Sequence, residues 1–273
     1  NIMQMSISGR KNPNLHISDH IPHVLGHAKE YGKSYINLDD VDYIYGFPAG
    51  FGSPLLGGRL VEVGNISTEE LHWLYYNNIG LKIPMTSVYF SEDLYQESLQ
   101  LLTEFHRKGN SILVSTDKLA ARIKEDFPLY ALELSAVKDV DSHKKMERVD
   151  RSLYDTICLP ICVNDELSFL EELDNKEQIR LFWNVECSYN CPNKVCYTSI
   201  SKRNKGDTDE DMKCSSWTYN MPRTFVKDVD WSKFYFDLAK YQDMGFTKWK
   251  LLNPDAGQQR IELMRDGLNV KFL

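Results

Sequence analysis

Short apolar runs alternate along the chain with longer stretches in which apolar side chains recur every three or four positions. The short runs have the length of buried strands, and the longer stretches are typical of helices with one apolar face. Eight strands are predicted, over residues 4–8, 41–47, 82–89, 111–115, 130–135, 155–162, 178–185 and 247–252. Helices are expected over residues 21–31, 68–78, 91–108, 117–126, 143–152, 165–173, 231–244 and 257–266.

The regular exchange of strand and helix predicts parallel strands joined by helical crossovers. Eight such units fit a chain of 273 residues folded as an α/β protein, a TIM-like (β/α)8 barrel. An open doubly wound sheet is the alternative, although it would normally use fewer strands. Because no linker divides the chain, we expect one barrel domain over residues 1–273, with an insertion at about residues 186–220 after a late strand.

Polar residues stand repeatedly at the predicted ends of strands. In such barrels the functional groups lie at the carboxyl ends of the strands, so these residues indicate an active face. The strand-end residues are Ser87, Tyr89, Ser115, Asp117, Glu133, Ser135, Asn164, Asn184, Glu186, Lys250 and Asn253. Among them we expect Lys250, Glu133 and Glu186 to bind or protonate a substrate.

A loop rich in glycine follows the second predicted strand, over residues 49–58, and leads to Arg59. Glycine and proline favour a turn or a lid here, and no helix begins directly after the loop as a phosphate cradle would require. If the loop contacts a ligand or cofactor, Arg59 is the residue expected to hold an anionic group.

Composition narrows the possible partners. The formal net charge of −7 argues against broad binding to nucleic-acid phosphates, although a local basic pocket is compatible with it. No apolar run reaches the roughly 18 residues of a membrane-spanning helix, so we expect no membrane association. The first residues lack the features of a signal peptide, and we expect a cytoplasmic protein.

All six cysteines lie between positions 158 and 214. This clustering differs from a disulfide scaffold spread through a small secreted chain, and it points to metal binding. Four thiolates can enclose zinc or an iron–sulfur cluster, and the expected ligands are Cys187, Cys191, Cys196 and Cys214. Structural zinc usually uses two tight pairs of cysteines, so a compact triplet with one distant cysteine favours iron–sulfur over zinc.

The two remaining cysteines lie in or at the end of a predicted strand. Cys158 is expected to pack in the core, because free cysteine behaves as a small apolar residue. Cys162 lies nearer the active face and could replace Cys214 as the fourth ligand. Radical-SAM enzymes also place three cluster cysteines on a barrel, but their cysteines are separated by three and then two residues and follow the first strand. In this chain the separations are three and four residues, and the cysteines follow a late strand.

The segment Trp183-Asn-Val-Glu-Cys187-Ser-Tyr-Asn-Cys191-Pro resembles the Asn-x-x-Cys-x-x-x-Cys-Pro segment of barrel proteins related to the collagenase-like U-thirty-two peptidase family. The downstream Cys214, the pattern from Tyr241 to Gly245, and a strand carrying Lys250 are similar as well. Where relatives carry glycine three residues after that lysine, this chain has Asn253.

The resemblance implies a [4Fe–4S] cluster held by the late cysteines. It also implies oxygen-independent hydroxylation, or another modification, of RNA or of a small aromatic substrate. An electron-transfer or other protein partner is possible for such an enzyme. Two alternatives remain open at this stage: a non-enzymatic binding protein with a structural zinc or iron–sulfur site, and an atypical radical-SAM-like enzyme.

Overall fold

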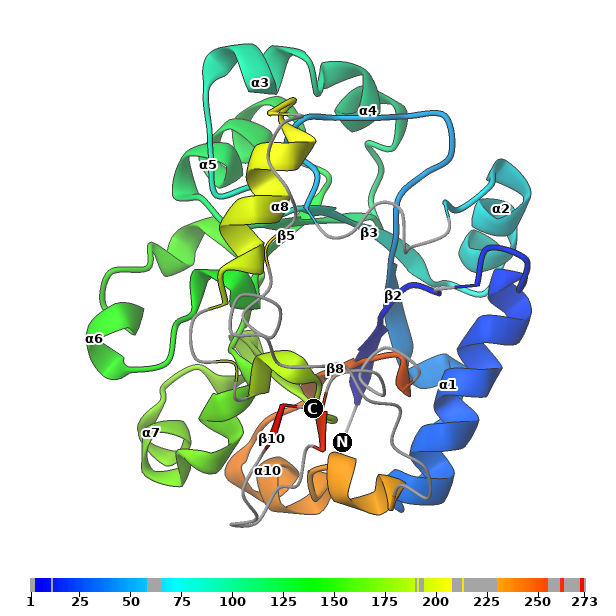
Figure 1. Ribbon diagram of the computed structural model, residues 1–273, viewed down its shortest axis with the longest axis vertical. Helices are drawn as coiled ribbons and strands as arrows, with labels where there is room; N and C mark the ends of the chain where they lie inside the picture. Colours follow the sequence, from blue (N-terminus) through cyan, green and yellow to red (C-terminus); the bar gives the residue numbers. More distant parts are fainter. Residues whose placement is uncertain are drawn as a thin grey trace.

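Eight parallel strands close into a barrel in the computed structural model, which describes residues 3–10, 12–57, 65–189, 191, 194–207, 213, 230–254, 261–262 and 271–272. The strands follow one another around the barrel in chain order, and the first pairs with the last (Figure 1). They are β1 (Gln4–Ile7), β2 (Val41–Tyr45), β3 (Gly80–Met85), β4 (Ser111–Val114), β5 (Ala131–Leu134), β6 (Thr156–Cys158), β7 (Ile179–Phe182) and β8 (Lys248–Leu251). The predicted eight-stranded barrel is therefore confirmed.

Helices surround the barrel on its outside, except the helix over Cys196–Asn204, which lies at the mouth (Figure 1). The described ones are α1 (Ile17–Gly32), α2 (Thr68–Tyr76), α3 (Glu92–Gln96), α4 (Leu99–Glu104), α5 (Asp117–Asp126), α6 (His143–Met146), α7 (Leu167–Glu172), α8 (Cys196–Asn204) and α10 (Leu238–Met244). Several of them have a side-chain cap at their first turn. At the start of α5, for example, the hydroxyl of Thr116 accepts a hydrogen bond from the backbone N–H of Leu119. None of the helices in the described ranges has the length and hydropathy needed to span a bilayer.

Several expectations for the helices differ from the structure. The helix expected over residues 143–152 is α-helical only in α6, and the one expected over residues 231–244 is α-helical only in α10. The helix expected over residues 91–108 is divided into α3 and α4, because the hydroxyl of Ser98 turns back to donate to the carbonyl of Leu94. The helix expected over residues 257–266 is wrong at β9 (Ile261–Glu262), which pairs antiparallel with β10 (Lys271–Phe272). The rest of that range lies outside the described residues. Helix α8 was not expected.

The barrel interior carries a layer of charged side chains. Lys82, Glu133 and Arg180 are each only 1% exposed inside it. Glu133 accepts hydrogen bonds from Lys82 Nζ at 3.0 Å and from Arg180 Nε at 2.7 Å. Arg180 also donates to Asp42 at 2.7 Å, and the Asp42 carboxylate accepts from Ser6. Two cations thus face two carboxylates, so the burial of each charge is compensated.

This layer lies one step below the mouth of the barrel. Side chains two positions apart on a strand point to the same face, so each inward residue has a successor nearer the carboxyl end. Ser6, Lys82, Glu133 and Arg180 are followed in this way by Ser8, Pro84, Ser135 and Phe182, all of which line a cavity at the mouth. The charged layer therefore lies directly beneath the residues that line the mouth cavity.

Candidate functional site

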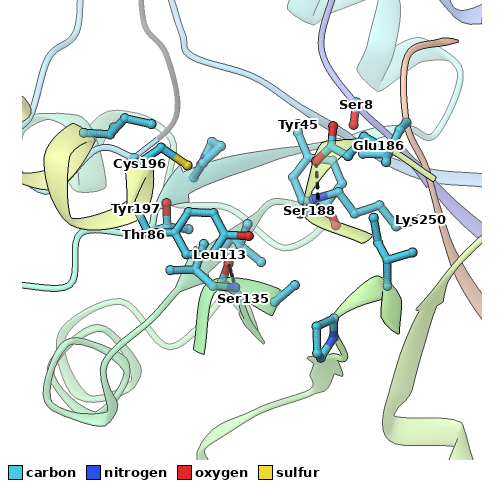
Figure 2. Close-up of a pocket in the computed structure, with 18 of the residues that line it drawn as sticks. Ser8, Tyr45, Thr86, Leu113, Ser135, Glu186, Ser188, Cys196, Tyr197 and Lys250 are labelled. Carbon is cyan, nitrogen blue, oxygen red and sulfur yellow. Dashed lines mark hydrogen bonds between the residues drawn. The ribbon is translucent and has the colours of Figure 1, made fainter. Parts of the chain in front are cut away.

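A cavity of about 340 Å³ opens at the carboxyl ends of the strands. Its walls come from strand ends around the barrel and from the segment that includes α8 (Figure 2). The strand-end contributors include Ser8, Tyr45, Thr86, Leu113, Ser135, Phe182 and Lys250. The volume is within the range of small-molecule sites, and the position is where barrel enzymes place their chemistry.

Much of the cavity wall is apolar. Leu113, Val137, Pro160, Ile161 and Leu252 contribute aliphatic surface. Figure 2 shows two groups of polar side chains at this cavity: Cys196 and Tyr197 on one side, and Ser8, Glu186, Ser188 and Lys250 on the other. The cavity therefore combines a hydrophobic surface with a few charged groups, the usual composition of a ligand site.

Lys250 projects into this cavity from β8. The strand pairs with β1 on one side and β7 on the other, so Lys250 stands in register with Ser6 and Phe182. Its ammonium lies 4.1 Å from the centre of the Tyr45 ring and 5.2 Å from that of Phe182. The two aromatic faces hold the cation electrostatically without neutralising its charge.

Glu186 reaches the cavity from the loop after β7. The loop is fastened by Asn184, whose side-chain amide donates to the carbonyl of Leu252 at 2.9 Å and accepts from the N–H of Leu252 at 2.8 Å. The backbone of Asn184 also forms an isolated antiparallel β-bridge with Tyr235. These bonds join the loop to the end of β8, so the positions of Glu186 and Lys250 depend on each other.

Glu133 lies in the charged layer and does not line the cavity. Burial alone would raise the pKa of its carboxyl, but the charges of Lys82 and Arg180 outweigh burial and lower the pKa to about 2. Burial is also the main reason that the pKa of Lys82 falls to about 8. Glu133 communicates with the cavity through Tyr45, whose hydroxyl donates to it at 2.8 Å.

The described cysteines divide into two kinds. Cys191 and Cys196 are half-buried and line the mouth cavity. Cys158 is buried in β6, as expected for a core residue, and burial is the main cause that raises the pKa of its thiol to about 12. Cys162 is half-buried and packs against the core without lining the cavity, and burial raises the pKa of its thiol.

Several predicted residues fall outside what the structure describes. These are the side chain of Cys187 and the whole of Cys214 and Arg59, together with much of the expected insertion over residues 186–220. In the part of the chain that is described, no group of three or more His, Cys, Asp or Glu side chains is arranged to hold a metal ion. The expected four-cysteine site therefore stays a prediction.

Lys194 lines the cavity but was not among the residues expected from the sequence. Its ammonium forms an ion pair with Asp139 at 2.6 Å, and its backbone N–H donates to Cys191 Sγ at 3.4 Å. The pair joins the cysteine segment to the loop after β5. The signal was its place between Cys191 and Cys196, where a basic residue lies close to the cysteine side chains.

No family model matches this chain, and no curated protein matches its sequence. Among solved structures, that of the U32 peptidase Mk0906 resembles it with a TM-score of 0.53 and 13% sequence identity, covering 92% of both chains. At this identity the likeness shows the fold alone. The expected resemblance to U-thirty-two-related barrel proteins is thus confirmed at the level of the barrel.

Proposed function

We propose that this protein is an enzyme whose active site is the mouth cavity and which binds an iron–sulfur cluster at the edge of that cavity. The observation that carries the proposal is the meeting of Cys191 and Cys196 with Lys250 and Glu186 around one cavity. Soft thiolates, a cation and a carboxylate at the mouth of a barrel are the parts that a cluster enzyme needs.

The donor chemistry fits a cluster. Cys187, Cys191 and Cys196 supply three thiolates within ten residues, and the hydrogen bond that Cys191 Sγ accepts from Lys194 is of the kind that tunes cluster sulfur. Cys214 is proposed as the fourth ligand, with Cys162 as the alternative. A bound cluster would supply electron-transfer chemistry that no side chain offers.

The chain's own residues would bind and orient the substrate. Lys250 would bind an anionic group, and Glu186 would accept or return a proton. A cavity of about 340 Å³ suits a small molecule, and the net charge of −7 is unfavourable for RNA, so a small aromatic or apolar substrate is preferred over RNA. The resemblance suggests oxygen-independent hydroxylation or a related modification. Hydroxylation with oxygen from water releases two electrons and two protons, and a redox partner would accept those electrons.

Metal analysis of anaerobically purified protein tests the proposal. We expect iron and sulfide in stoichiometric amounts and a broad absorbance near ~400 nm, as for cysteine-bound clusters. Cys191→Ser should lose the iron, whereas Cys158→Ala, the matched removal of a core cysteine, should keep it. A colourless protein with stoichiometric zinc would contradict the cluster, and iron retained in Cys191→Ser would contradict the ligand set.

The fourth ligand is identified by a second pair of variants. Cys214→Ser is expected to lower the iron content and to change the absorbance spectrum, while Cys162→Ser leaves both at the level of the unmodified protein. The reverse result would assign the fourth position to Cys162.

A further inference from the structure

Two charges in the mouth cavity have no ionic partner among the described residues. Within the described ranges, the ammonium of Lys250 lies over the rings of Tyr45 and Phe182, and the carboxylate of Glu186 has one long contact, 3.5 Å from the hydroxyl of Ser188. The two side chains do not pair with each other. Lys194, the other basic residue among the described residues of the cavity, is already neutralised by Asp139. Lys250 and Glu186 are therefore the charged groups available to a ligand.

Both groups lie on the same side of the cavity, beside a broad apolar surface (Figure 2). Half-buried charges without partners cost free energy, and a ligand that neutralises them recovers part of that cost. The aromatic rings under Lys250 fix its position while leaving its N–H groups free to donate. The ammonium of Lys250 can therefore donate to an anionic group of a ligand, and Glu186 can accept from a donor group on the same ligand.

We propose that the mouth cavity binds a small carboxylate that has an apolar body and a hydroxyl or ammonium group near the carboxylate. The carboxylate accepts from Lys250 Nζ, the hydroxyl or ammonium donates to Glu186, and the body packs on the wall of Leu113, Val137 and Ile161. This assignment rests on the proposed function in taking the mouth cavity as the substrate site, but it does not require the cluster.

Other occupants match the cavity less well. Inorganic phosphate would leave the apolar wall uncovered and would meet the negative charge of Glu186. An apolar cation would leave Lys250 unpaired and close to its own charge. A hydroxy or amino carboxylate answers both charges and the apolar surface at once, which is the complementarity expected of a specific site.

Calorimetric titration with four probes of one shape tests the proposal. The probes are 3-phenyllactate and phenylalanine, which carry all three features, 3-phenylpropionate, which lacks the donor, and phenylalaninol, which lacks the carboxylate. We expect 3-phenyllactate or phenylalanine to bind most tightly, and phenylalaninol to bind at least about tenfold more weakly, the usual loss for a hydrogen bond to a charged group.

The variants assign the contacts. Lys250→Met should weaken the binding of the acids by about tenfold or more. Lys248→Met is the same change two residues earlier in β8 and outside the cavity, and it should leave their binding unchanged. Glu186→Leu leaves no acceptor for the ligand's donor group and should remove the preference for 3-phenyllactate or phenylalanine over 3-phenylpropionate. Lys250→Arg keeps the charge and should retain binding, which separates loss of the cation from loss of the fold, as do thermal unfolding curves of each variant.

The outcomes separate this inference from the cluster proposal. Titrations are run on protein with and without bound metal, so carboxylate binding is measured whatever the metal analysis shows. Binding of none of the acids, equal binding of phenylalaninol and the acids, or unchanged affinity in Lys250→Met would each overturn the inference. A colourless protein that still binds 3-phenyllactate through Lys250 would overturn the cluster alone.

Discussion

At the scale of single residues, two glycines give opposite predictions for the same substitution. A Cβ added to Gly80 at the start of β3 would lie 1.9 Å from the backbone carbonyl oxygen of Gly109, which cannot move without shifting the chain. Gly26 lies within α1, and a Cβ there would meet nothing within 4 Å. We expect Gly80→Ala to destabilise the fold by about 1–3 kcal/mol, and Gly26→Ala to stabilise it by about 0.5–1 kcal/mol.

Urea unfolding of the two variants measures both effects. Gly26→Ala is the control for the chemical change itself, since it adds the same methyl group where space and helix propensity favour it. A Gly80→Ala protein as stable as the unmodified one would show that β3 and the Gly109 turn are further apart than described.

The site residues show how far single positions can be interpreted from a sequence. Cys158 was correctly expected in the core, because an apolar strand surrounds it. Glu133 was expected at a strand end, yet it lies inside the barrel with partners 47 to 88 positions away in the chain. A local pattern cannot show those partners. Without those partners, a carboxylate inside the barrel cannot be distinguished from one at the mouth of the barrel.

At the scale of elements, the pattern located all eight strands of the barrel and several helices. Strands of a parallel barrel are buried on both faces and appear as continuous apolar runs, which are easily recognised. Helix α5 matches its predicted bounds because Thr116 and a regular apolar face define it. Helix α8 was missed because its sequence, from Cys196 to Asn204, is rich in serine and has no clear apolar face.

Glu70 joins three elements and gives a prediction of pH dependence. It forms a capping box with Ser67 at the start of α2, accepts from the N–H of Ile17 at the start of α1, and pairs with the buried Arg10 after β1. Burial would raise the pKa of the Glu70 carboxyl, but the hydrogen bonds from Arg10 and the backbone lower it to about 2. A folded-state pKa below the ordinary value near 4.5 means that the ionised carboxylate stabilises the fold.

That contribution is fully present above about pH 4.5 and is lost as the pH falls toward about 2. Glu70→Gln should therefore cost about 2–4 kcal/mol at pH 7, with a difference from the unmodified protein that shrinks below pH 4.5. Urea unfolding at a series of pH values measures this. Glu69→Gln, at the neighbouring exposed carboxylate that contacts His16, should change stability little at any pH. A pH-independent cost for Glu70→Gln would contradict the argument.

At the scale of the whole molecule, the charged layer connects the barrel walls across its interior. Ser6, Asp42, Lys82, Glu133 and Arg180 come from β1, β2, β3, β5 and β7, and Arg180 also donates to a carbonyl of β8 at 2.7 Å. Most barrels fill this layer with branched apolar side chains. Here the layer fixes Tyr45 through Glu133, and Tyr45 in turn lies under Lys250. The buried charges thus fix the positions of Tyr45 and Lys250 in the mouth cavity.

Removing one carboxylate from this layer should destabilise the whole barrel. Glu133→Gln leaves two buried cations facing only Asp42, and we expect a loss of about 3–5 kcal/mol in the free energy of unfolding. Glu172→Gln, which removes an exposed partner of His143, should change it by less than about 0.5 kcal/mol. Adding Lys82→Met to Glu133→Gln restores the charge balance, so the double variant should be more stable than the sum of the single losses predicts. Strictly additive losses would mean that the layer is a set of independent contacts and does not act as a unit.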